Sequence, residues 1–175
     1  MSESIENVLF CIDSSSFIYL HRFYPPDFFK DIWSEFEGLF DQDKIISHII
    51  VFEELTTSSK NKDDLTKWII PKRKYFKDYN LKQVYYVSQI INRFPGLIDP
   101  DREKDQADPW LIALAIEEQS QLQLFNPKQK VIVVNEESKG KPQRIPDVCN
   151  YYGLEHLNLL ELFNYFGWDF VLRKK

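Results

Sequence analysis

The chain has 175 residues, a formal net charge of −5 at pH 7, and abundant aromatic residues: fourteen Phe, nine Tyr and four Trp. This length fits a single domain over residues 1–175 with a sizeable core. The sequence lacks an apolar run near the ~18 residues of a membrane span, a glycine-rich phosphate loop, zinc-ligand spacing and a signal peptide. We therefore expect a soluble, cytoplasmic protein that uses neither zinc nor a membrane.

The first half of the chain alternates buried strands with helices. Residues 8–12 are apolar without alternation, which indicates a strand covered on both faces, as in a parallel sheet. Pro25 and Pro26 end the helix that follows this strand, and the β-branched stretch 44–47 predicts a second buried strand. We expect helices at residues 15–24, 27–40 and 49–57.

The second half predicts more helices around a third strong strand at residues 130–134. The stretch 107–116 is apolar nearly all round, so we expect a deeply buried helix there. A short strand near residues 156–157 completes the sheet. The pattern predicts an α/β sandwich with a mostly parallel central sheet. Further helices are expected at residues 63–68, with an interruption at Pro71, and at residues 81–94, 147–152 and 159–166.

Acidic residues follow the three strong strands and open the most apolar helix. The carboxyl ends of parallel strands share one edge where ligands bind, so these side chains could meet in one crevice. Carboxylates gathered there would raise each other's pKa unless a cation neutralised them, and hard oxygen ligands suit Mg²⁺ or Mn²⁺. The candidates are Asp13, Glu53, Glu54, Asp108, Glu136 and Glu137.

Each acid also has a structural interpretation. Asp13 precedes three serines and is typical of a helix N-cap, and Asp108 with Pro109 is typical of an N-cap followed by the first helical residue. A Glu on an amphipathic helix or in a polar loop commonly faces solvent. Basic clusters at residues 72–77, 139–144 and 173–175 could be solvated faces or a rim that holds phosphates.

Four segments follow one another along the chain in the order 11–15, 51–55, 107–115 and 133–137. In this order they resemble the PIN-domain superfamily. The closer resemblance is to a PIN-like subfamily of small bacterial and archaeal proteins, of which the segment 145–149 is also typical. The resemblance spans nearly the whole chain, and its most specific parts are the strand that ends in Asp13 and the helix that begins Ala107-Asp108-Pro109.

The resemblance implies a three-layer α/β/α sandwich and a Mg²⁺- or Mn²⁺-dependent endoribonuclease, which hydrolyses RNA with a metal-activated water. Many relatives are VapC-type toxins that are inhibited by a small antitoxin protein and are often homodimers. Carried over by motif, Asp13 and Asp108 are the principal metal ligands, and Glu54 completes the site. Ser14 would hold Asp13 or a metal-bound water.

The fourth acid departs from the family pattern. Many PIN nucleases have Thr-x-Asp there, whereas this chain has Asn135-Glu136-Glu137. Spacing favours Glu137 as the fourth acid, and Glu136 is the alternative. In the same way, Glu53 is the alternative to Glu54. This departure and the acidic charge keep a second hypothesis open, a catalytically weak PIN-like module that binds RNA or protein. A phosphatase of the haloacid dehalogenase type would need a second Asp where Ser15 stands.

Overall fold

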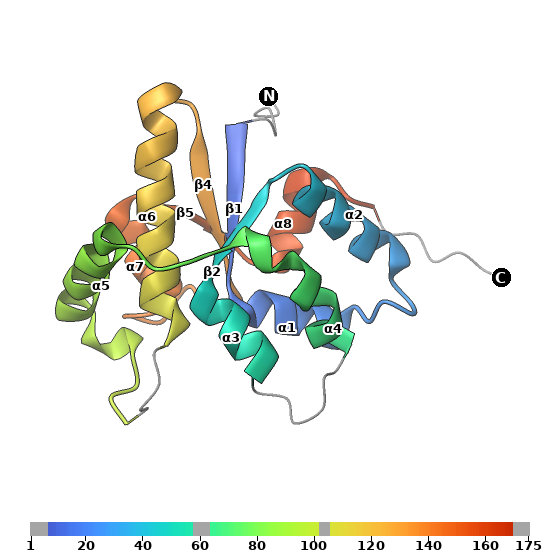
Figure 1. The fold of residues 1–175 in the computed structure, drawn as a ribbon, viewed down its shortest axis with the longest axis horizontal. Helices are drawn as coiled ribbons and strands as arrows, with labels where there is room; N and C mark the ends of the chain where they lie inside the picture. The colour runs from blue at the N-terminus through green and yellow to red at the C-terminus, as the bar shows by residue number, and fades with distance from the viewer. Residues whose placement is uncertain (1–6, 58–63, 102–105, 170–175) are drawn as a thin grey trace.

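A computed structural model describes residues 7–57, 64–101 and 106–169. Its centre is a five-stranded, entirely parallel sheet in the order β3-β2-β1-β4-β5. Helices cover both faces of this sheet (Figure 1), so the predicted three-layer α/β/α sandwich is confirmed. The strands are β1 Val8–Ile12, β2 Ile45–His48, β3 Phe76–Lys77, β4 Lys130–Val134 and β5 Glu155–Leu157.

The helices form two outer layers. In Figure 1, α5, α6 and α7 lie on one side of the strands, and α1, α2, α4 and α8 lie on the other. None of the helices in the described ranges is long and apolar enough to cross a membrane. The helical elements are α1 Ser14–Phe23, α2 Lys30–Asp41, α3 Ile49–Thr57, α4 Asp64–Ile69, η2 Ile70–Tyr75, α5 Leu81–Arg93, η3 Pro95–Leu97, α6 Ala107–Phe125, α7 Ile145–Tyr152 and α8 Leu159–Phe166.

The centre of the sheet is β1, which pairs with β2 on one side and with β4 on the other. Phe10 stands opposite Ile45 and Ile132 in these two pairings, and all three side chains are almost completely buried. Strands covered on both faces need this continuous apolar character, which is why the sequence shows no alternation here. Cys11 in β1 and Cys149 in α7 are buried, free thiols.

The order of the strands creates a switch point between β1 and β4. The chain places β2 and β3 on one side of β1, then returns and places β4 and β5 on the other side. Loops that leave neighbouring strands in opposite directions open a crevice at the carboxyl edge, where α/β proteins bind ligands. Asp13 and Asn135 each come directly after one of these two strands, and the Asp13 N–H donates to the Val134 carbonyl at 2.9 Å.

The observed elements differ from the predicted ones mainly at their ends. The two-residue strand β3 was not predicted, because two residues carry no periodicity. The apolar helix continues to Phe125 rather than Ile116, and α2 starts at Lys30 rather than Asp27. The predicted helix start at Asp63, the N-terminal residues 1–6 and the basic cluster 173–175 lie outside the described residues.

Gly153, which ends α7, offers a test of the backbone geometry. Its φ is +69°, and no atom lies within 4 Å of the position that a Cβ would take, so only the left-handed backbone opposes a side chain there. We expect Gly153→Ala to lower the free energy of unfolding by about 1 kcal/mol. Gly140→Ala is the matched control, since Gly140 has equal space without a positive φ. Urea unfolding measures both, and equal stability of the two variants would contradict the assigned geometry.

Candidate metal centre

Asp13 stands where β1 ends and α1 begins, and its two carboxylate oxygens have different surroundings. Oδ2 accepts hydrogen bonds from the Ser15 N–H at 3.0 Å and from the Ser15 hydroxyl at 2.5 Å, so it caps α1. Oδ1 is buried and has no hydrogen-bond partner among the described residues. Asp13 is only 3% exposed, and burial raises the pKa of its carboxyl group. One oxygen therefore holds the helix while the other is left for a further partner.

Asp108 lies in the first turn of α6, and the alternative interpretation that it caps this helix does not hold. The N-cap is Gln106, so Asp108 and Pro109 lie two positions further into the helix than expected. Proline is tolerated there because the N–H groups of the first turn have no partner within the helix. Capping therefore does not account for the Asp108 side chain.

The electrostatic effects on Asp108 indicate that the four predicted acids lie in one cluster. The pKa of Asp108 is raised to about 8, first by burial and then by the charges of Asp13, Glu137 and Glu54. The Arg144 guanidinium acts in the opposite direction. Effects of this kind require charges that lie close together in a poorly solvated place. We call Asp13, Glu54, Asp108 and Glu137 the acidic cluster.

Glu54, rather than its neighbour Glu53, faces this cluster. Its Oε2 accepts a hydrogen bond from the Ser14 hydroxyl at 2.7 Å, and its Oε1 lies 3.4 Å from the Ala107 N–H at the start of α6. Glu53 is exposed. Ser14 thus orients Glu54, whereas Ser15 makes the contact to Asp13 that we predicted for Ser14. The predicted supporting serine is in the site but holds a different acid.

Glu137 is the fourth member of the cluster. Its Oε2 accepts from the Ile145 N–H at 2.6 Å, and its Oε1 lies 3.6 Å from Arg144 Nη1. The alternative, Glu136, has a different environment.

Glu136 belongs to the start of α8. Its Oε1 accepts from the Leu159 N–H at 2.9 Å and from the Ser16 hydroxyl at 3.3 Å. The structure therefore separates the two adjacent glutamates by the helices they contact, and the charge of Glu137 is the one that raises the pKa of Asp108.

Three supporting residues were not predicted. Ser15 could have been found from its position two residues after Asp13, which is common in Asx turns. Asn135 is buried and accepts the Glu137 N–H at 3.0 Å, another local turn that the sequence allowed. The sequence predicts Arg144 only as part of a basic cluster. Its proximity to Glu137 depends on how the 135–144 loop folds, which no local pattern shows.

Two lysines of the predicted basic clusters have structural partners. Lys72 is 8% exposed, pairs with Glu37 at 2.8 Å and lies 4.3 Å from the centre of the Trp68 ring. Lys139 pairs with Glu161. Of the two basic clusters that lie within the described residues, the one at residues 139–144 reaches the acidic cluster, through Arg144.

The donor set of the acidic cluster fits a hard divalent cation. All four members offer carboxylate oxygens, and the buried Asp13 Oδ1 lacks a compensating donor among the described residues. Within those residues, no three His, Cys, Asp or Glu side chains are arranged closely enough to hold an ion by themselves. Mg²⁺ needs no such cage, because it usually keeps several waters and takes one or two carboxylates. The residues present therefore fit Mg²⁺ or Mn²⁺.

Comparison with known proteins places the chain in one family. Residues 10–170 match the family described as a domain of unknown function (DUF4411), and the chain belongs to it. No curated protein matches the sequence.

The raised pKa of Asp108 predicts how stability depends on pH without divalent ions. An unfolded Asp titrates near pH 3.9, so the folded protein holds this proton more tightly, and stability falls as pH rises from about 4 through about 8. We expect Asp108→Asn to melt above the wild type at about pH 9 and close to it at about pH 5. Glu53→Gln, which removes an exposed acid, should show no such pH-dependent gain. A stability difference of Asp108→Asn that is the same at both pH values would contradict the assigned clustering.

Proposed function

We propose that this DUF4411 protein is a metal-dependent endoribonuclease of the PIN type. One observation carries the proposal: four carboxylates from separate segments converge at the switch point of a parallel sheet, and one buried oxygen among them lacks a partner within the described residues. A cation relieves this repulsion, whereas a purely structural site would have paired its charges. The resemblance to PIN nucleases at the same residues supports the reaction class.

In this proposal Asp13 and Asp108 are the principal metal ligands, and Glu54 and Glu137 complete the site. When bound, Mg²⁺ or Mn²⁺ supplies the charge that makes water a nucleophile and stabilises the leaving oxygen of a phosphodiester. Ser14 fixes the carboxylate plane of Glu54. The Ser15 contacts hold Asp13 through Oδ2 and leave its Oδ1 for the metal ion.

Arg144 is placed to meet the substrate. Its guanidinium lies beside Glu137, and its side chain is 46% exposed. An arginine fork matches the geometry of a phosphate group. We assign Arg144 to positioning the RNA backbone at the edge of the acidic cluster.

The biological setting follows from the same resemblance. The protein would be the toxin of a toxin–antitoxin pair, acting on RNA in the cytoplasm, held inactive by a small antitoxin and able to form a homodimer. The two free, buried thiols agree with a reducing compartment.

A second function is a catalytically weak PIN-like module that binds RNA or protein. The observation that favours it is the fourth acid: both oxygens of Glu137 already have partners, the Ile145 N–H and Arg144. Metal binding and cleavage separate these two functions.

Cleavage of RNA tests the proposed site. With Mn²⁺ present, we expect Asp13→Asn to lower the cleavage rate by more than about 100-fold, beyond the 10–100-fold typical of residues that only support a ligand. Glu54→Gln should be similarly impaired, while Glu53→Gln on the same helix should cleave like the wild type. Expression of the wild type should inhibit growth, and Asp13→Asn should relieve this inhibition. Cleavage that survives Asp13→Asn would refute the assignment.

Metal binding is tested without RNA. Calorimetry of the wild type with Mn²⁺ should give saturable binding, and Mn²⁺ at about 100 times its dissociation constant should stabilise the fold by about 2.7 kcal/mol. Asp13→Asn should lose both effects because it removes the unpaired carboxylate charge. Glu53→Gln is again the matched control. If the wild type releases no heat and gains no stability with Mn²⁺, the binding module is the function that remains.

A further inference from the structure

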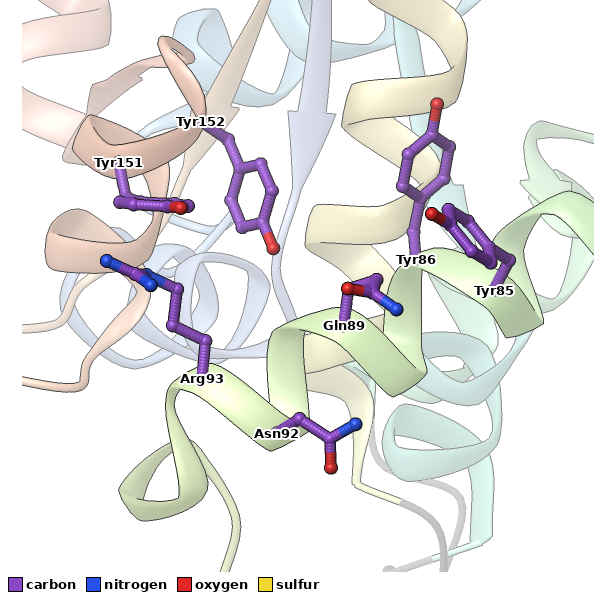
Figure 2. A pocket seen from close by; sticks show the side chains of 7 residues that line it. All are labelled: Tyr85, Tyr86, Gln89, Asn92, Arg93, Tyr151 and Tyr152. Atoms are coloured by element: carbon purple, nitrogen blue, oxygen red, sulfur yellow. The ribbon is translucent and has the colours of Figure 1, made fainter.

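A second surface feature lies between α5 and α7. Four tyrosines gather there, Tyr85 and Tyr86 from α5 and Tyr151 and Tyr152 from α7, around a hollow of about 490 Å³. We call it the tyrosine groove. Figure 2 shows Tyr152 pointing from α7 into the space above α5, with Arg93 reaching up to Tyr151. The Arg93 guanidinium lies 4.1 Å from the centre of the Tyr151 ring.

The chemistry of this groove is that of a stacking site with polar edges. Tyr85 is 62% and Tyr151 53% exposed, so much of each ring is open to solvent. The remaining lining residues, Gln89 and Asn92, carry amide donors and acceptors, and none of the lining residues is acidic. Tyr85, Gln89 and Asn92 are spaced four and three residues apart, so they share one face of α5.

The groove is physically connected to the acidic cluster. The first residue of α7, Ile145, donates its N–H to Glu137, and Tyr151 lies six residues further along the same helix. At 1.5 Å per residue these positions are about 9 Å apart along α7. This spacing corresponds to between two and three stacked nucleotides at about 3.4 Å per nucleotide of one strand.

The wall of the groove that α5 forms is hydrogen-bonded to the 135–144 loop. The Gly96 N–H, just after α5, donates to Gln143 Oε1 at 2.6 Å, and a Cβ at Gly96 would lie only 2.8 Å from that oxygen. Both walls of the groove are therefore tethered to the 135–144 loop, which carries Glu137 and Arg144. A strand held at the acidic cluster could pass along Arg144 towards the groove.

From these observations we propose that the tyrosine groove binds the bases of single-stranded RNA on one side of the cleaved phosphate. The inference rests on the proposed ribonuclease function. Aromatic rings stack on any base, and an arginine adds a cation–π contact and attraction to the phosphates. The amides of Gln89 and Asn92 would contact base edges. A protein partner is the competing occupant, because Leu81 and Val84 earlier on α5 are also exposed.

The test measures RNA binding separately from cleavage. A fluorescently labelled oligouridine of about 12 nucleotides is titrated with the full chain in EDTA and low salt, and fluorescence anisotropy is followed. We expect Tyr85→Ala and Tyr151→Ala each to weaken binding about tenfold or more, since each removes one stacking ring. Tyr85→Phe and Tyr151→Phe should stay within about twofold, because stacking needs the ring and not the hydroxyl.

Phe125→Ala is the matched control for the loss of an exposed ring. Phe125 is 89% exposed at the end of α6, at the opposite end of that helix from Asp108. This variant should bind RNA like the wild type. Thermal melting of each alanine variant checks that the fold is retained, and the phenylalanine variants keep the test valid if an alanine variant unfolds.

The outcomes separate this inference from the proposed function. If folded alanine variants bind RNA like the wild type, or the wild type binds none, the groove is not an RNA site. If they change the oligomeric state but leave RNA affinity unaltered, the groove is a protein interface and the inference is overturned. If RNA binding depends on the rings while the wild type cleaves nothing with Mn²⁺, the groove assignment holds and the ribonuclease proposal fails.

Discussion

The parallel pairing of β1 with β4 is the constraint on which the rest of the structure depends. These two strands are adjacent in the sheet but more than a hundred residues apart in the chain, and the chain leaves them in opposite directions. Their carboxyl ends bring Asp13 and Glu137 to one edge. The apolar helix α6 packs on this central part of the sheet and delivers Asp108 to the same place. The site is thus a consequence of sheet topology rather than of any local motif.

The acidic cluster is unfavourable by itself, and its surroundings show how the fold accommodates it. Burial and mutual repulsion raise the pKa of Asp108, while Ser14, Ser15 and the Ile145 N–H satisfy oxygens of the other acids. One oxygen of Asp13 is still left without a described partner. Functional sites commonly retain destabilising features of this kind, and the remaining core compensates for them.

A buried hydrogen-bond network around His48 contrasts with the acidic cluster. At the end of β2, His48 bonds to Gln83 at 3.2 Å, Gln83 to Glu117 at 2.9 Å, and Asn80 to Glu117 at 2.8 Å. Burial lowers the pKa of His48 to about 4, so it is neutral near pH 7 and stacks on Trp110. This network satisfies its members and is well explained as part of the core. What distinguishes the acidic cluster is the mutual repulsion of its carboxylates together with the buried Asp13 Oδ1, which has no partner among the described residues.

The sequence by itself determined the layered α/β class, four of the five strands of the described sheet and most helices, because buried strands and helical periodicity are local signals. For the site it supplied six candidate acids. It could not decide between Glu53 and Glu54 without the family resemblance, and it left Glu136 open beside Glu137, since adjacent glutamates are locally equivalent. Nor could it decide whether Asp13 and Asp108 only cap helices. Tertiary structure decided these points: Gln106 holds the N-cap of α6, Ser14 contacts Glu54, and α8 takes Glu136. The tyrosine groove could not be predicted from the sequence either, because its residues come from α5 and α7, two helices that tertiary structure places in the same outer layer. Local patterns fix which segments become helices and strands, whereas the direction of a side chain depends on contacts between segments far apart in the chain.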